Sequence, residues 1–261
     1  MTRETASPSP CPDPSLTLYG IGHAYLGRTV LDAVDLSLTV GEVAALVGPS
    51  GCGKSTLAHI AAGVVEPMRG RVMRGYRRHG MVFQDPRLLP WATARANIAY
   101  PLRLLGLSRR ERHDRAEEAA GRVALDAGDL DKFPIELSGG MRQRAAIARA
   151  LAVDPDFIYF DEPFTALDVA LKRRMQDLVI ESSRATRFGA LFITHDLMEA
   201  VRIAHRVLVM DVQGRGIAGA RTIPGEPGAR DDGDLYRLVG GFLADDPLFR
   251  HIHDIDERRI P

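Results

Sequence analysis

The sequence predicts an α/β fold with a mainly parallel sheet, an antiparallel β subdomain and an inserted α-helical subdomain. Two short apolar runs, residues 43–46 and 157–160, are typical of buried strands. The first leads through a glycine-rich loop into an apolar, small-residue run at 57–62 that is typical of a helix. From 154 to 210 strand and helix patterns alternate, which indicates parallel strands joined by crossover helices.

The glycine-rich loop matches Gly-x-x-x-x-Gly-Lys-Ser, the phosphate-binding pattern of a P-loop NTPase core. Glycines let backbone N–H groups turn toward an anion, and the helix N-terminus adds partial positive charge. Lys54 is expected to reach the β- and γ-phosphates of a nucleotide, and the Ser55 hydroxyl to ligate Mg²⁺. The flanking strand and helix disfavour the alternative, a glycine-rich turn with a surface lysine. The predicted binding residues are Gly48, Pro49, Ser50, Gly51, Cys52, Gly53, Lys54, Ser55 and Thr56.

Two carboxylates directly follow the apolar run 157–160, and Pro163 then stops the strand. A parallel strand ending here would place Asp161 and Glu162 beside the phosphate-binding loop. Asp161 is predicted to hold Mg²⁺ through water, and Glu162 to act as the general base that polarises an attacking water. Alone, the pattern would favour a solvated acidic turn; downstream of a phosphate-binding loop, we favour the functional interpretation.

A second helix with an anion-binding end is predicted from Ser138, Gly139 and Gly140. Ser138 suits the N-cap of a helix over about 141–152, and the glycines expose backbone donors. The alternative is an ordinary capped helix. Because one chain needs a single such site per phosphate group, we infer that this helix end binds the γ-phosphate held by another subunit.

In this order, the motifs resemble the nucleotide-binding subunit of ATP-binding-cassette (ABC) transporters over about 16–210. The resemblance implies ATP and Mg²⁺ as ligands. It also implies that Tyr25 stacks on adenine, that Gln84 contacts Mg²⁺ and senses the γ-phosphate, and that His195 contacts the γ-phosphate. Asp168 matches the loop that crosses the dimer. Taken singly, Tyr25 could be a core aromatic, Gln84 a strand-end cap and His195 a satisfied histidine.

Two stretches, 82–91 and 162–168, resemble stand-alone importer ATPases of the nitrate, sulfonate and taurine group. This implies an ATP-hydrolysing subunit at the cytoplasmic face of the plasma membrane. Its implied partners are a second copy or a paralogous ATPase subunit, an integral membrane permease and, indirectly, a solute-binding protein. Alternatives are the ATPase of a lipid-transport or export complex and a soluble cluster-assembly ATPase. Repair and translation types carry long coiled coils or tandem cassettes, which this sequence lacks.

The segment after Gln84 contains three large apolar residues, Leu88, Leu89 and Trp91. Pro86 and Pro90 keep this segment from forming a simple helix. Such a run in a loop belongs either to the core or to an interface. We favour an interface, because the family docks a short permease helix beside this loop.

Composition excludes several classes of protein. With 45% hydrophobic and 26% charged residues, the chain is ordinary for a soluble globular protein. The formal net charge of zero gives no reason to expect nucleic acid as a partner. No apolar run is long enough to span a membrane, and the N-terminus lacks a secretory apolar core. Two cysteines, Cys11 and Cys52, do not make a disulfide framework.

The domain organisation is predicted from shifts in composition. Residues 1–14 are expected to be a disordered tail, 15–212 an ABC ATPase domain with a helical subdomain at about 85–151, and 213–261 a C-terminal extension. The short segment 63–84 is predicted to be a trimmed antiparallel hairpin. Within the extension, only a short helix near 235–243 is expected.

Overall fold

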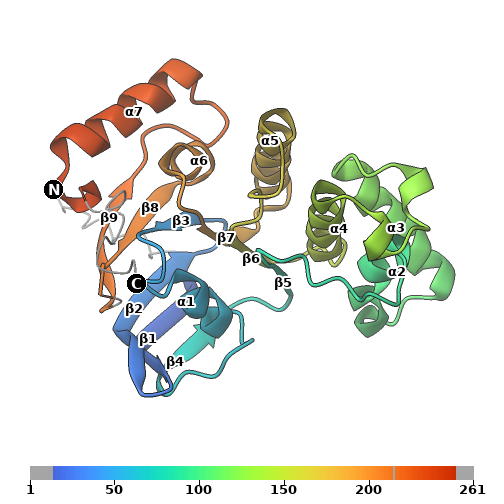
Figure 1. Ribbon diagram of the computed structural model, residues 1–261, viewed down its shortest axis with the longest axis horizontal. Helices are drawn as coiled ribbons and strands as arrows, with labels where there is room; N and C mark the ends of the chain where they lie inside the picture. Colours follow the sequence, from blue (N-terminus) through green and yellow to red (C-terminus); the bar gives the residue numbers. More distant parts are fainter. Residues whose placement is uncertain (1–13, 214, 251–261) are drawn as a thin grey trace, which may run out of the picture.

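The protein is described here from a computed structural model that covers residues 14–213 and 215–250. Within these residues the main sheet has six strands in the order β5-β6-β7-β3-β8-β9 (Figure 1). Pairing is parallel from β5 through β8 and antiparallel only between β8 and β9. The predicted mainly parallel α/β sheet is therefore confirmed. The strands are β5 His79–Val82, β6 Phe157–Asp161, β7 Gly189–Ile193, β3 Val43–Val47, β8 Arg206–Met210 and β9 Ile217–Thr222.

A second sheet, β2-β1-β4, is antiparallel and confirms the predicted β subdomain. Its strands are β1 Pro14–Tyr25, β2 Arg28–Thr39 and β4 Arg69–Arg74. The hairpin predicted over 63–84 is wrong, because β4 pairs with β1 whereas β5 joins the main sheet beside β6. The two strands complete the edges of different sheets. Gly80 allows this placement of β5, since a Cβ there would lie 2.9 Å from Cβ of Ala150.

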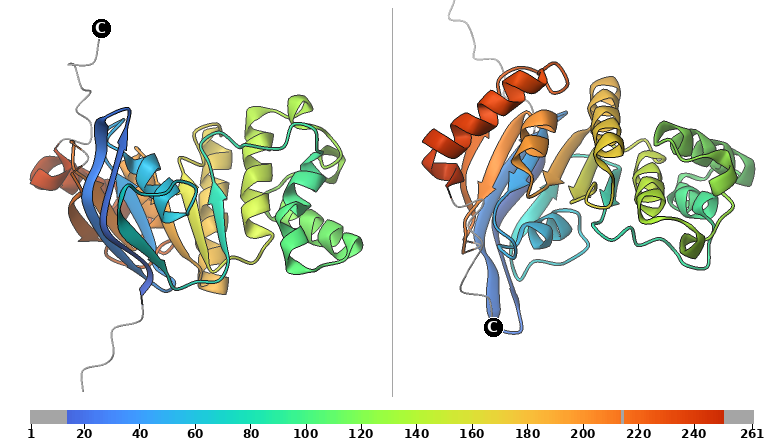
Figure 2. Two further views of the ribbon diagram at one scale, coloured as in Figure 1. Left: turned by 90° about the horizontal axis from the view of Figure 1, so that it is seen from below. Right: turned by 45° about the horizontal axis from the view of Figure 1, so that its top comes forward.

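Helices cover both faces of the main sheet, and a separate group of helices lies at one end. Helix α1 packs between the two sheets, whereas α5, α6 and α7 lie on the other face (Figure 1). The group α2, α3 and α4 lies at the end of the molecule opposite α7 (Figure 2). The α-helices are α1 Lys54–Ala61, α2 Ala94–Ala99, α3 Arg109–Arg122, α4 Gly139–Leu151, α5 Val169–Thr186, α6 Leu197–Ile203 and α7 Asp232–Asp245. Short 3-10 helices are η1 Pro101–Leu105, η2 Ala127–Asp129, η3 Pro134–Glu136 and η4 Pro247–Phe249.

Strand β3 is apolar at every position because both of its faces are buried. Val43, Ala45 and Val47 belong to the core cluster on the α5–α6 side, whereas Ala44 and Leu46 belong to the cluster around α1. Alternate side chains of a strand point to opposite faces, so a central parallel strand covered on both faces needs apolar residues at every position. The strand ends at Val47 and delivers the glycine-rich loop at the carboxyl edge of the sheet.

Residues 215–250 contain more regular secondary structure than the sequence indicated. Strand β9 pairs with β8 and extends the main sheet, and α7 has 14 residues instead of the short helix expected at 235–243. Arg230 fixes this segment to the end of α6 by donating to the carbonyl oxygens of Val201 and Ala204 at 2.6 and 2.9 Å. The tail predicted at 1–14 lies almost wholly outside the described residues.

None of the helices among the described residues is long and apolar enough to cross a lipid bilayer.

Candidate nucleotide-binding site

The phosphate-binding loop connects β3 to α1 through backbone angles that favour glycine. Gly51 and Gly53 have φ values of 77° and 100°. At Gly53, a Cβ would also lie 2.9 Å from Cδ2 of Leu31, so a side chain is excluded by both backbone and space. Helix α1 begins at the next residue, Lys54, so the N–H groups of its first turn face the loop.

The ammonium group of Lys54 is held inside this loop. Its Nζ donates to the carbonyl oxygens of Gly48 and Pro49 at 2.8 and 2.7 Å, and the residue is 6% exposed. Burial raises the pKa of the adjacent Cys52 thiol. The loop therefore presents one fixed positive charge together with backbone donors, which is the arrangement that phosphate groups require.

A hydroxyl and a carboxylate meet at the start of α1. Oγ of Ser55 donates to Oδ1 of Asp161 at 2.8 Å, and Asp161 is 3% exposed at the end of β6. One hydroxyl and one carboxylate are a suitable protein ligand set for Mg²⁺, because this ion takes its remaining oxygen ligands from water and nucleotide phosphates. Among the described residues there is no group of three or more His, Cys, Asp or Glu side chains that could hold a metal ion by themselves.

Glu162 and His195 come together from neighbouring strands. Oε2 of Glu162 lies 3.3 Å from Nδ1 of His195. Glu162 has a φ of 44°, and its N–H donates to the carbonyl oxygen of Ile193 at 3.0 Å. A left-handed backbone at a residue other than glycine is uncommon, and such strain gathers at functional sites. Here it turns the carboxylate away from the direction that β6 would impose and toward the cleft.

Hydrogen bonds anchor the segment around Gln84 to helix α4. Nε2 of Gln143 donates to the carbonyl oxygen of Phe83 at 3.2 Å. The guanidinium of Arg149 donates to the carbonyl oxygens of Pro86 and Arg87 at 2.8 and 2.9 Å. The position of Gln84 therefore depends on the same helix that begins at Ser138–Gly139.

One cleft of about 540 Å³ gathers most of the predicted site residues. This volume is within the usual range for a small-molecule site. Tyr25 is 48% exposed, so its ring remains accessible on one side of the cleft. The lining residues are Tyr25, Val30, Ser50, Gly51, Gly53, Lys54, Ser55, Thr56, Gln84, Glu162 and His195.

Eight predicted residues do not line this cleft. Four of them contact Lys54 or Ser55 beside it: Gly48, Pro49, Cys52 and Asp161. The other four belong to different elements: Ser138, Gly139, Gly140 and Asp168. Oγ of Ser138 accepts from the N–H of Met141 at 3.2 Å, which confirms its prediction as an N-cap. Asp168 caps α5 in the same way, through the N–H of Leu171 at 3.0 Å. A Cβ on Gly140 would lie 3.4 Å from Leu167, so the start of α4 and the loop before Asp168 form one continuous surface.

Sequence reasoning missed several residues of the site. Val30 lines the cleft, and His59 lies 3.2 Å from Asp161 through its Nε2 atom. The position of His59, four residues after Ser55 on one helix, was an available signal, because such residues share a helix face. Gln143 and Arg149 carried no signal, since their backbone partners are about 60 residues away in sequence.

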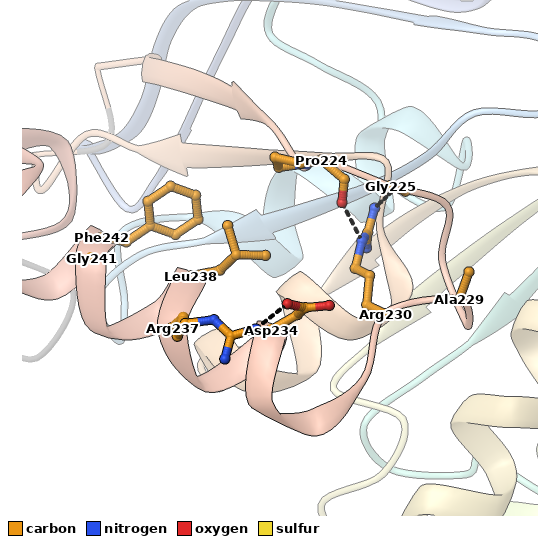
Figure 3. A pocket seen from close by; sticks show the side chains of 9 residues that line it. All are labelled: Pro224, Gly225, Ala229, Arg230, Asp234, Arg237, Leu238, Gly241 and Phe242. Atoms are coloured by element: carbon orange, nitrogen blue, oxygen red, sulfur yellow. Dashed lines mark hydrogen bonds and ion pairs between the residues drawn. The ribbon is translucent and has the colours of Figure 1, made fainter.

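A second cavity of about 600 Å³ is formed by residues near the C-terminus, from Pro224 to Phe242, beside α7 (Figure 3). It is larger than the cleft, but its charged groups are already paired. Arg230 donates to backbone carbonyl oxygens that include those of Pro224 and Gly225, and Arg237 pairs with Asp234. The cleft at the phosphate-binding loop, where Lys54, Glu162 and His195 lie beside the N-terminus of α1, is the candidate functional site.

The fold and this cleft define a P-loop ATPase. A family model described as ABC transporter matches residues 31–165. The chain belongs to the ABC transporter family, as the order of its motifs predicted, and it binds and hydrolyses ATP.

Similar proteins agree with the group predicted from the sequence. The aliphatic sulfonates import ATP-binding protein SsuB 1 of Nocardia farcinica is 43% identical over 232 residues, which cover 88% of this chain and 91% of that protein. The taurine import ATP-binding protein TauB of Sinorhizobium fredii is 44% identical over 191 residues, 70% of this chain and 71% of that one. Among solved structures, the ATP-binding cassette MJ0796 as a dimer bound to ADP and Pi is 28% identical, with a TM-score of 0.74 over 80% of this chain and 99% of that chain.

Proposed function

We propose that this chain is the ATP-hydrolysing subunit of an importer for nitrate-, sulfonate- or taurine-like solutes. The proposal is supported by relatives that are named as import ATP-binding proteins and that align with most of this chain. A membrane permease and a solute-binding protein would complete the importer. The chain would work as a peripheral subunit at the cytoplasmic face of the membrane.

The observation that carries the proposal is the convergence of three strand ends on one cleft. Lys54 after β3, Asp161 and Glu162 at the end of β6, and His195 after β7 come from strands that are neighbours in the sheet. In parallel sheets, ligands bind at the carboxyl ends of the strands. Charged side chains that follow three neighbouring strands therefore lie in or beside the same cleft.

Each residue has a distinct role toward bound ATP. Lys54 and the loop N–H groups would hold the phosphates, and Tyr25 would stack on adenine. Ser55, Asp161 and Gln84 would hold Mg²⁺, directly or through water. When bound, Mg²⁺ neutralises phosphate charge. Glu162 would take a proton from the attacking water, and His195 would orient that carboxylate and contact the γ-phosphate.

A second subunit would supply the remaining anion-binding elements of each site. Ser138, Gly139 and Gly140 lie outside the cleft of their own chain, with the Asp168 loop beside them. Two subunits in head-to-tail arrangement would place each Ser138–Gly140 segment on the γ-phosphate of the other. The second subunit would be another copy of this chain or a paralogous ATPase subunit. ATP would then stabilise the closed dimer, and hydrolysis would release it.

An exposed apolar segment next to the Gln84 loop would contact the permease. Trp91 is 75% exposed and Leu104 is 89% exposed, and Tyr100 between them is half exposed. Leu88, which the sequence analysis grouped with Trp91, instead packs against the main core. The proposed contact therefore centres on Trp91 and on η1.

Affinity isolation of the chain from detergent-solubilised membranes tests the proposal. A permease of the sulfonate or taurine type, together with a solute-binding protein encoded nearby, is the expected result. Recovery of a lipid-transport or export complex would favour that alternative, and recovery of soluble cluster-assembly proteins alone would overturn the transport assignment.

A further inference from the structure

His59 is a polar residue of the site for which the ATPase mechanism above provides no role. It lies in the last turn of α1, one helical turn after Ser55, so both side chains project from the same face of the helix. That face meets the end of β6. The side chain of His59 is 18% exposed, close to the nearly buried carboxylate of Asp161.

The two oxygens of Asp161 are contacted by different side chains of α1. Oδ1 accepts from the Ser55 hydroxyl at 2.8 Å, and Oδ2 lies 3.2 Å from Nε2 of His59. That ring nitrogen is buried, and among the described residues it has no aligned hydrogen-bond partner. A buried polar atom without such a bond is costly unless its neighbour compensates. Among the ion pairs of the described residues, His59 has one charged partner, which is the carboxylate assigned to the metal.

The imidazole of His59 also contacts the loop that carries Gln84. Its ring meets the ring of Phe83 edge-on, with 5.5 Å between centroids and 61° between planes. Phe83 is fixed on two other sides, by Gln143 at its carbonyl oxygen and by the Arg87 guanidinium 4.3 Å above its ring. His59 thus connects the carboxylate of Asp161 with the residue that precedes Gln84.

We propose that His59 is a positioning residue of the metal site. Its ring nitrogen holds the Asp161 carboxylate through Oδ2, and its contact with Phe83 fixes the position of Gln84 relative to that carboxylate. This inference rests on the proposed role of Asp161 and Gln84 toward Mg²⁺. Side chains that orient metal-binding carboxylates typically change metal affinity by about ten- to hundredfold when removed. A purely structural role, such as favourable charge at the C-terminal end of α1, would change the stability of the fold without changing the Mg²⁺ requirement.

Two variants separate the polar contact from the packing contact. His59→Phe keeps an aromatic ring against Phe83 but removes the nitrogen that faces Asp161. His59→Gln replaces the ring but places an amide N–H donor near the position of Nε2. His113→Phe is the matched control, because His113 is a half-buried histidine on α3, outside the cleft.

The experiment measures binding of a fluorescent, non-hydrolysable ATP analogue to the full chain, first in EDTA and then at increasing MgCl₂. We expect His59→Phe to raise the Mg²⁺ concentration at the midpoint by about tenfold or more, with unchanged affinity in EDTA and unchanged Tm. His59→Gln should restore most of the shift, and His113→Phe should show none. Equal Mg²⁺ midpoints for the parent and His59→Phe would overturn the proposal. So would a fall in Tm and in the nucleotide affinity measured in EDTA that is in proportion to the shift in the midpoint.

The variant Asp161→Asn shows whether a negative result concerns His59 alone or the proposed metal site as a whole. A raised Mg²⁺ midpoint in Asp161→Asn with none in His59→Phe overturns the role of His59 alone. If Asp161→Asn leaves the midpoint unchanged, the metal assignment itself is wrong and the inference falls with it.

Discussion

Nδ1 of His195 lies 3.3 Å from Oε2 of Glu162, and both side chains line the cleft that contains Lys54. The histidine side chain is 61% exposed and the glutamate side chain 20% exposed. The imidazole therefore orients the carboxylate from the solvent side while remaining accessible itself. This geometry is compatible with the proposed roles, in which Glu162 accepts the proton and His195 contacts a phosphate.

Glu162→Gln should bind ATP with near-parental affinity and hydrolyse it about 10²–10⁴-fold more slowly. The amide keeps the volume of the side chain and can still contact His195, but it cannot accept a proton from water. Phosphate release and equilibrium nucleotide binding measure the two effects. Lys54→Ala is the contrasting variant, because it should lose binding itself. Turnover of Glu162→Gln at the parental rate would show that the base is another group.

His195→Ala should also have low turnover, because the Glu162 carboxylate loses its orienting partner. Its ATP binding should survive, since His195 contacts neither the loop nor Lys54 among the described hydrogen bonds and ion pairs. The same two assays apply. A variant that loses ATP binding as completely as Lys54→Ala would indicate that His195 supports the cleft rather than the chemistry.

Ser138→Arg should leave ATP binding to an isolated subunit intact and abolish ATP-dependent dimerisation. Ser138 does not line the cleft of its own chain, whereas a long cation at this helix end would block the γ-phosphate of a partner. The test is light scattering with ATP in the Glu162→Gln background, which should dimerise without Ser138→Arg. The loss of the N-cap costs about 1 kcal/mol, so Ser138→Ala serves as the control for stability.

The phosphate-binding loop and its strand partners were predictable because each depends on local patterns. The run 43–46, the glycines and Lys54 specify strand, turn and helix within a few residues, and parallel pairing then brings Asp161 beside them. By contrast, β9 was missed, because an edge strand with the sequence IAGART has little hydrophobic alternation. Its place is set by pairing with β8 rather than by its own residues.

The incorrect hairpin over 63–84 has a similar physical cause. Two short strands near each other in sequence suggest mutual pairing, but β1 and β6 offer free edges to β4 and β5 respectively. Competition between edges is a property of the whole sheet, which a local pattern does not contain. The contact of His59 with Asp161 is another case, since it appears only once β6 ends beside α1.

Arg230→Met should destabilise the fold by about 3 kcal/mol and lower Tm by about 6–10 °C. Burial lowers the pKa of the Arg230 guanidinium, which nevertheless stays charged at neutral pH. It donates to five carbonyl oxygens that join α6 to the segment before α7, those of Val201, Ala204, Ile223, Pro224 and Gly225. Methionine would keep the apolar stem but leave these acceptors without a donor.

Arg237→Met is the matched control for Arg230→Met, because both arginines line the same cavity (Figure 3). Among the described residues, Arg237 pairs only with Asp234, on the surface, so its loss should cost less than about 1 kcal/mol. Thermal unfolding of both variants checks the difference. Equal Tm values for the two would show that the C-terminal segment contributes little to the stability of the cassette.

Trp91→Asp should leave the isolated subunit folded and able to hydrolyse ATP, yet prevent it from co-purifying with membranes. Trp91 is 75% exposed, so its replacement removes little packing within the chain. A charge at the centre of an apolar contact with the permease would be desolvated without a partner, which is costly. Membrane fractionation, followed by immunoblotting of the subunit, measures the loss.

Tyr236→Asp is the control for Trp91→Asp, since Tyr236 is 69% exposed on α7 at the opposite end of the molecule (Figure 1). It should remain membrane-associated. Leu88→Asp should behave differently from both, because Leu88 packs against the main core and a buried charge there should lower Tm. If Trp91→Asp fractionates with membranes as well as Tyr236→Asp does, the permease contacts another surface, and the exposed side chains of Trp91, Tyr100 and Leu104 need a different explanation.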